Sequence, residues 1–276
     1  MDDQELRKLR LKARDIRKTV IEAIGNLGIG HIGGCMSIVE TLVILYYRFM
    51  NIDPANPKKP DRDKLVLSKG HAGPTLYGIL SDLGYFPKEW LASLNRGGSR
   101  LPSHCDMNLT PGVDMTTGSL GHGLSAGVGM AIGHKLDKLA STIYVIIGDG
   151  ECNEGQVWEA AMAGAQFGLD NLIAFLDYNK MELDGYMDEV MDIADITAKW
   201  VSFNWFVQRI DGHDYQQLER AIVRAQHERH RPAMIVLDTI KGKGCSFAEN
   251  RVESHNMNFD SEKAREAIAV LDREQI

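Results

Sequence analysis

Short apolar runs alternate along the chain with segments in which apolar residues recur every three or four positions. A short apolar run rich in β-branched residues is typical of a buried strand, whereas the three-to-four spacing is typical of an amphipathic helix. The predicted strands cover residues 64–68, 142–147, 172–176, 205–210 and 233–238. The predicted helices cover residues 5–25, 37–50, 73–84, 118–136, 154–168, 214–229 and 261–272, with a further one beginning after Pro87.

Strands and helices therefore alternate over most of the chain. Near-continuous apolar strands separated by helices are typical of a parallel sheet with helices on both faces, so we expect an α/β fold of that kind. Ser37 is the predicted N-cap of the helix over 37–50. Residues 96–117 and 179–197 lack strong periodicity, and the first of these segments is long enough to indicate a functional loop.

The length, composition and charge of the chain exclude several classes of protein. With 276 residues, 44 % of them hydrophobic, the chain can build a sizeable core as one large or two small domains. Its net charge of −7, without a basic stripe, argues against nucleic acid as a partner. No apolar stretch approaches the roughly 18 residues of a membrane span, and the charged N-terminus is unlike a signal peptide. Four well-separated cysteines allow disulfides on count alone, but they favour a reduced, cytoplasmic protein.

Polar residues end two of the predicted strands that follow one another along the chain. Gly148-Asp149-Gly150 follows one strand, and Asn179 follows the next. Ligands of parallel α/β sheets bind beyond the carboxyl ends of the strands. Asp149 and Asn179 offer the hard oxygen ligands that suit Mg²⁺, with a backbone carbonyl from Met181 as a third ligand and the amide of Gly150 available for phosphate. The alternative is that Gly-Asp-Gly is merely a tight turn, which both residue types favour.

This pattern resembles the diphosphate-binding motif of thiamine diphosphate enzymes. Other segments are similar, in the same order, to those of transketolases: Gly30-His31, Leu67 to His71, His104, Thr117 to Gly121, Gly148 to Gly155, Asp177 to Lys180 and Lys241 to Gly244. They cover nearly the whole chain. The chain thus resembles the N-terminal part of transketolases, which implies a single thiamine diphosphate-binding domain (PP type) over 1–276. The implied cofactors are thiamine diphosphate and Mg²⁺, or Ca²⁺ or Mn²⁺ in its place.

The resemblance assigns roles to four histidines. It places His31, His71 and His104 along the channel above the thiazolium ring, where imidazoles donate hydrogen bonds to a sugar and move protons near neutral pH. His255 corresponds by its spacing to a histidine near the diphosphate and the substrate, although Ser254 stands where an aromatic residue is common. Without the resemblance, a lone histidine is more often a structural or surface residue.

The resemblance also implies a set of cofactor-binding residues: His71, Gly118, Ser119, Leu120, Gly150, Glu151, Asn179, Lys241 and His255. The segment from Gly118 to Leu120 approaches the aminopyrimidine ring of the cofactor in the family. Lysines are usually solvated. Lys69 and Lys241, however, each lie in a glycine-flanked turn after a strand, which is a good position for meeting the charge of a diphosphate.

Transketolases carry further domains after the region matched here, including a pyrimidine-binding domain whose glutamate polarises the cofactor ring. This chain ends soon after Lys241, so we expect either a fragment or, as its charged C-terminal helix favours, one subunit of a split transketolase. A separate C-terminal subunit would carry the pyrimidine-binding domain in an α₂β₂ assembly. Together the subunits would transfer a two-carbon ketol unit from a ketose phosphate to an aldose phosphate.

Three alternatives stay open at this point. The chain could belong to another thiamine enzyme, such as a deoxyxylulose-phosphate synthase. Its substrate could also be a specialised sugar rather than an intermediate of the pentose phosphate pathway. The third alternative, a non-catalytic paralogue, is disfavoured because Asp149, Asn179, His31, His71 and His104 are all present.

Overall fold

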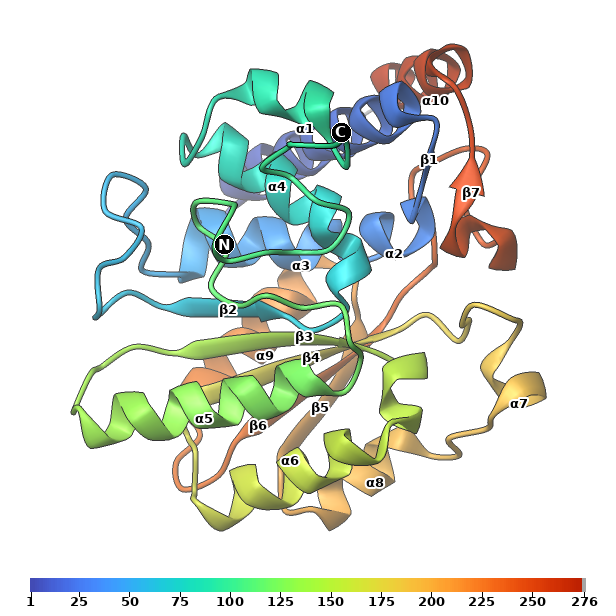
Figure 1. Ribbon diagram of the computed structural model, residues 1–276. Helices are drawn as coiled ribbons and strands as arrows, with labels where there is room; N and C mark the ends of the chain where they lie inside the picture. Colours follow the sequence, from blue (N-terminus) through green and yellow to red (C-terminus); the bar gives the residue numbers. More distant parts are fainter. Residues whose placement is uncertain (275–276) are drawn as a thin grey trace.

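A five-stranded, entirely parallel sheet with strand order β2-β3-β4-β6-β5 forms the centre of the protein (Figure 1). The computed structural model describes residues 1–274. The strands are β2 (Lys64–Leu67), β3 (Ile143–Gly148), β4 (Leu172–Tyr178), β5 (Phe206–Asp211) and β6 (Ala233–Asp238). All five predicted strands are confirmed to within one or two residues at their ends.

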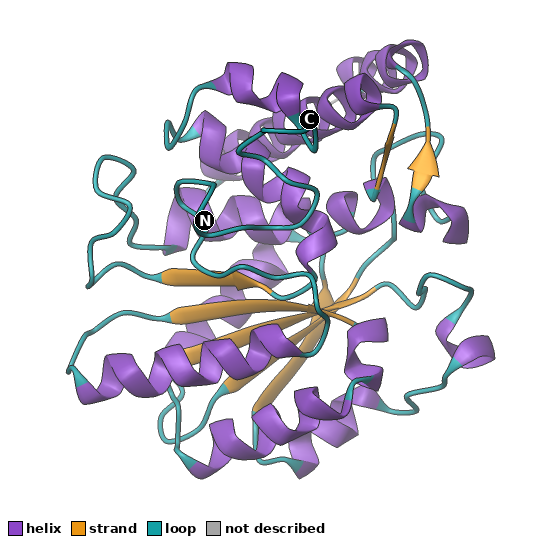
Figure 2. Cartoon of the chain, viewed as in Figure 1, coloured by secondary structure: helices purple, strands orange, loops and turns teal. Residues whose placement is uncertain are grey.

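Helices cover both faces of this sheet (Figures 1 and 2). The apolar core on one face includes residues of α1 (Asp3–Leu27), α3 (Val39–Ile44), α4 (Gly73–Asp82), α9 (Tyr215–His227) and α10 (Ser261–Arg273). Helix α1 packs on α3 and α4, and α10 packs on α1, so α1 and α10 form a layer farther from the sheet (Figure 1). The other face carries α5 (His122–Leu136), α6 (Gly155–Gln166) and α8 (Ile196–Ser202). Alternate strand residues point to opposite faces, so Ile146 packs in the first apolar core while Val145 and Ile147 pack in the second. The predicted fold class is confirmed.

Shorter elements complete the chain: β1 (Ile29–Gly30) pairs antiparallel with β7 (Met257–Asn258), and the remaining segments are α2 (Ile32–Met36), a π-helical turn (Leu45–Phe49), α7 (Met187–Val190) and 3₁₀ turns at Gly70–Ala72, Lys88–Ser93, Gly150–Asn153 and Val252–His255. The sequence pattern did not predict β1, β7, α2, α7 or α8. In residues 1–274 no helix combines the length and apolar character needed to cross a bilayer.

Two predicted helix starts are wrong. Ser37 does not cap a helix N-terminus: it follows the last residue of α2, and its hydroxyl donates to Asp177 at 2.7 Å. The helix predicted over 118–136 begins at His122, because Gly118 and Gly121 have φ angles of +150° and +85°. These angles are incompatible with a right-handed helix and favour glycine.

The last helix packs directly on the first. A Cβ added to Gly25 of α1 would lie 2.6 Å from the Cβ of Ala264 in α10, so only glycine allows this approach of the two backbones. Lys18 and Asp272 form an ion pair of 2.6 Å across the same contact. The two ends of the described chain are therefore joined in one packed layer (Figure 1).

Candidate active site

A cavity of about 310 Å³ lies beyond the carboxyl ends of β3 and β4. Parallel pairing sets Gly148 opposite Asp177, which brings the residues after both strands to the same edge of the sheet. Nine of the predicted site residues line this cavity: His71, Leu120, Asp149, Gly150, Glu151, Asn179, Met181, Lys241 and His255. Side chains that are distant in sequence thus converge on one space.

Asp149 and Asn179 are held by hydrogen bonds from backbone amides. The Asp149 carboxylate accepts from the amides of Gly150, at 3.0 Å, and Lys180, at 2.5 Å. The Asn179 oxygen accepts from the amide of Met181 at 3.1 Å. Burial and, after it, repulsion by the nearby Asp177 carboxylate raise the pKa of Asp149 to about 7. A cation bound beside this buried carboxylate would favour its ionised form.

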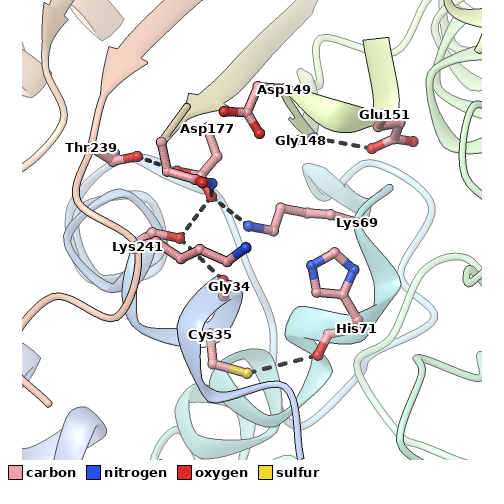
Figure 3. Close-up of polar contacts among 12 residues, drawn as sticks. Gly34, Cys35, Lys69, His71, Gly148, Asp149, Glu151, Asp177, Thr239 and Lys241 are labelled. Atoms are coloured by element: carbon pink, nitrogen blue, oxygen red, sulfur yellow. Dashed lines mark hydrogen bonds and ion pairs between the residues drawn. The ribbon is translucent and has the colours of Figure 1, made fainter. Parts of the chain in front are cut away.

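Asp177 is the centre of a buried polar network beneath the cavity (Figure 3). Its carboxylate forms an ion pair with Lys69 and accepts a hydrogen bond from Thr239, while the Asn179 amide donates to it at 3.2 Å. Asp177 is 0 % exposed and Lys69 is 1 % exposed. The sequence placed Lys69 in a good position for diphosphate; the structure instead shows its charge neutralised by Asp177, which sequence reasoning did not single out. A single acidic residue within an apolar strand was the available signal.

Lys241 supplies the positive charge at the opposite wall. Its ammonium donates to the carbonyl of Glu182 at 2.9 Å and to that of Met181 at 3.4 Å, and lies 3.3 Å from Nδ1 of His255. Burial lowers the pKa of Lys241 to about 8. The Glu182 side chain also faces this space, and its Oε1 is buried without a hydrogen-bond partner in the described chain.

His31, His71, His104 and His255 form one cluster of imidazoles. The His31 ring centroid lies 5.4 Å from that of His71, 5.5 Å from that of His104 and 5.6 Å from that of His255. Burial lowers the pKa of His31 to about 4 and that of His255 to about 3, with neighbouring positive or titratable groups adding to the effect. The pKa values of His71 and His104 are lowered too, mainly by burial. At neutral pH these rings are uncharged and can donate and accept hydrogen bonds.

The turn from Gly118 to Gly121 lies between the histidines and the start of α5. A Cβ on Gly118 would lie 3.4 Å from His104, so this glycine backbone packs against that imidazole. Leu120 contributes an apolar side chain to the cavity, whereas Gly118 and Ser119 do not line it. The structure thus places the apolar residue of the turn on the cavity wall.

A second buried network fixes the turn that carries Lys241. Arg17 donates to the carboxylate of Glu40 at 2.7 Å and to the carbonyl of Lys243 at 2.9 Å. Glu40 also contacts Nδ1 of His213 at 3.0 Å, and Nε2 of that ring accepts from the amide of Ile240 at 2.9 Å. The residues on both sides of Lys241 are therefore anchored to α1, α3 and the loop after β5.

The donor set fits a divalent cation and a polyanion side by side. Within residues 1–274 no three His, Cys, Asp or Glu side chains cluster in a metal-binding arrangement. A cation would therefore use Asp149 together with the amide oxygen of Asn179 and the carbonyl of Met181, which are the oxygen types that Mg²⁺ accepts. Gly150 packs closely against Glu182, since a Cβ at this position would lie 3.1 Å from the Cβ of that residue. Lys241 supplies the charge for an anion.

Comparison with known proteins identifies the family of this chain. A family described as "Transketolase, thiamine diphosphate binding domain" matches residues 9–271. The 6-deoxy-6-sulfo-D-fructose transketolase subunit SqwG of Clostridium sp. (strain MSTE9) is 53 % identical over 274 residues, which cover 99 % of each chain. An apulose-4-phosphate transketolase subunit from Phocaeicola vulgatus is 37 % identical over 96 % of this chain and 94 % of its own length.

Solved structures show the same relation at the level of the fold. Transketolase from Leishmania mexicana superposes with a TM-score of 0.91 at 28 % identity, over 96 % of this chain. The chain spans only 41 % of that protein, so it corresponds to part of a longer transketolase. The resemblance seen in the sequence motifs is confirmed: the chain belongs to the transketolase family and corresponds to its thiamine diphosphate-binding domain.

Proposed function

We propose that the chain is the cofactor-binding subunit of a split transketolase and forms a single domain over residues 1–276. With a partner chain that carries a pyrimidine-binding domain, it would transfer a two-carbon ketol unit from a ketose to an aldose. The observation that carries this proposal is the convergence of Asp149, Asn179, Lys241, His71 and His255 on one cavity, with His31 packed beside these two histidines and His104 beside His31, both outside the cavity lining. Relatives that match this chain over nearly their whole length are named as transketolase subunits.

One group of site residues would bind the metal ion and the diphosphate of the cofactor. Asp149, Asn179 and the carbonyl of Met181 would hold Mg²⁺, and Ca²⁺ or Mn²⁺ could take its place. The amide of Gly150 and the ammonium of Lys241 would bind the diphosphate. Thiamine diphosphate, when bound, supplies the electron sink that ketol transfer requires.

At the substrate end, His31, His71, His104 and His255 would line the sugar channel. Their rings are neutral at pH 7, so each can donate a hydrogen bond to one oxygen and accept a hydrogen bond from another group. Leu120, which lines the cavity, would support the aminopyrimidine ring by apolar contact. Gly118 and Ser119 would contribute through the backbone of the same turn, and Glu151 borders the cavity beside it. These roles make the chain responsible for holding the cofactor and for one wall of the sugar channel.

The first candidate donor is 6-deoxy-6-sulfo-D-fructose, the sugar named for the 53 % identical relative. A ketose phosphate is the second candidate, since the relatives from other bacteria are named for apulose 4-phosphate. Both are ketoses with an anionic group at the far end of the chain. We place the protein in the cytoplasm, where its four buried free thiols would stay reduced, and in an α₂β₂ assembly.

The test is to co-purify the chain with a partner subunit that carries the pyrimidine-binding domain, and to assay ketol transfer with thiamine diphosphate and Mg²⁺. Activity is expected only from the complex, and 6-deoxy-6-sulfo-D-fructose is compared directly with fructose 6-phosphate as the donor. Ketol transfer by this chain alone would overturn the split-enzyme proposal. Activity with neither donor, despite cofactor binding, would overturn the substrate proposal.

A further inference from the structure

Glu151 is a buried carboxylate whose oxygens are both hydrogen-bonded within the protein. Its Oε1 accepts from the amide of Gly121 at 2.9 Å and from the hydroxyl of Ser68. Its Oε2 accepts from the amide of Gly148 at 3.1 Å (Figure 3). The residue is only 2 % exposed. Although it borders the cavity, its acceptor atoms are therefore directed into the protein.

The three donors come from three different segments. Ser68 follows β2, Gly148 ends β3, and Gly121 closes the turn that precedes α5. The φ of +85° at Gly121 keeps this turn outside the helix that follows, so the turn does not share the hydrogen bonds of that helix. Glu151 is thus the side chain through which this turn is bonded to the ends of two strands.

Each of these segments carries a wall of the cofactor site. Gly148 precedes Asp149, the proposed cation ligand, and Gly121 follows Leu120, which lines the cavity. We infer that Glu151 is a positioning residue that fixes the distance between the cation-binding turn and the Leu120 turn, and thereby between the two ends of the cofactor. This inference rests on the proposed function and assigns the Glu151 side chain an indirect role in place of direct contact.

The physical basis is the cost of unpaired buried amides. Without the carboxylate, the amides of Gly121 and Gly148 would be left without their acceptor in a water-poor site. In Glu151→Gln only one oxygen remains, and the new amide group would face one of these N–H groups donor to donor. The turn that carries Leu120 would then relax away from the edge of the sheet. One cofactor molecule could no longer contact both this turn and the cation-binding turn at Asp149 in its bound conformation.

A matched control exists at the opposite end of the sheet. Asp63 is also buried, and its carboxylate accepts from the amides of Asn51, at 2.8 Å, and Thr142, at 2.7 Å. Asp63→Asn likewise replaces one acceptor oxygen of a buried carboxylate by an NH₂ group, but the segments that Asp63 joins carry no part of the cofactor site. A purely structural role for Glu151 predicts that the two substitutions behave alike.

The experiment titrates thiamine diphosphate into the complex of the chain with its partner subunit, in saturating Mg²⁺, by calorimetry, and records the melting temperature of each variant. Glu151→Gln is expected to raise the dissociation constant about tenfold or more, whereas Asp63→Asn changes it less than about twofold, at similar losses of melting temperature. Equal dissociation constants for the two variants would overturn the inference.

A second variant covers the case in which Glu151→Gln does not fold. Glu151→Asp keeps the charge but is one methylene shorter, so it cannot reach all three donors, and it is expected to weaken cofactor binding about fivefold. Wild-type affinity in Glu151→Asp would overturn the inference on its own. Failure of the wild-type complex to bind thiamine diphosphate would instead refute the proposed function, so the two failures are distinguishable.

Discussion

Replacing Lys69 by methionine tests the buried network beneath the cofactor cavity. Lys69 and Asp177 form an ion pair in which neither side chain is more than 2 % exposed. Lys69→Met keeps most of the length of the side chain but removes its charge, so Asp177 remains as a buried carboxylate. Hydrogen bonds from Ser37, Thr239 and Asn179 still reach that carboxylate.

Removing one partner of a buried ion pair costs about 3–5 kcal/mol of unfolding free energy, because the other charge is left uncompensated. The three remaining donors partly solvate Asp177, so we expect the lower end, about 3 kcal/mol. That is a large part of the roughly 5–15 kcal/mol by which native domains are stable, yet it leaves the protein folded. Urea unfolding followed by far-UV circular dichroism at pH 7 measures the difference.

Two further variants make this measurement specific. Lys18→Met breaks the exposed pair with Asp272 and should cost at most about 0.5 kcal/mol. In the double variant Lys69→Met/Asp177→Asn the uncompensated charge is gone. The double variant should therefore lose less unfolding free energy than the sum of the losses of the two single variants, by about 1–3 kcal/mol. A loss below about 1 kcal/mol for Lys69→Met, or strictly additive losses, would refute the reasoning.

Three other predictions concern the site and its supports. Asp149→Ala should abolish the Mg²⁺ dependence of thiamine diphosphate binding in calorimetric titrations; unchanged affinity would remove the metal assignment. His104→Ala should lower kcat about 100-fold while leaving cofactor affinity unchanged, and a pure cofactor defect would argue against a channel role. Burial alone would raise the pKa of Glu40, but Arg17 and His213 hold it at about 2. Glu40 therefore contributes stability above pH 4.5, which is lost as the pH falls toward 2, so the difference in Tm between wild type and Glu40→Gln should shrink below pH 4.5; a constant difference would contradict this.

The strands were predictable because a strand that is buried on both faces consists of a nearly continuous run of apolar residues. The placement of Asp149 and Asn179 at one edge of the sheet was predictable for a related reason, since both residues follow such runs. The first residues of the helices were harder to predict. Ser37 has the local character of an N-cap, but its hydroxyl is taken by Asp177, 140 residues away, and no local pattern contains that partner.

The networks that support the site depend on strand register and could not be predicted from local sequence. Lys69 and Asp177 are 108 residues apart, and Glu151 reaches Ser68 across 83 residues. Their pairing follows from β2, β3 and β4 lying side by side. Periodicity marks which residues are buried, but the identity of a buried polar partner is a property of the assembled sheet.

The contact between α1 and α10 has a consequence for the order of events during synthesis. Lys18 and Asp272 are 254 residues apart, and the surface of α1 around Gly25 is covered by α10. Contacts between such distant segments close large loops and slow the folding of a domain. Helix α1 leaves the ribosome long before α10 and reaches its final packing only when α10 has emerged, so until then this part of its surface is open to chaperones.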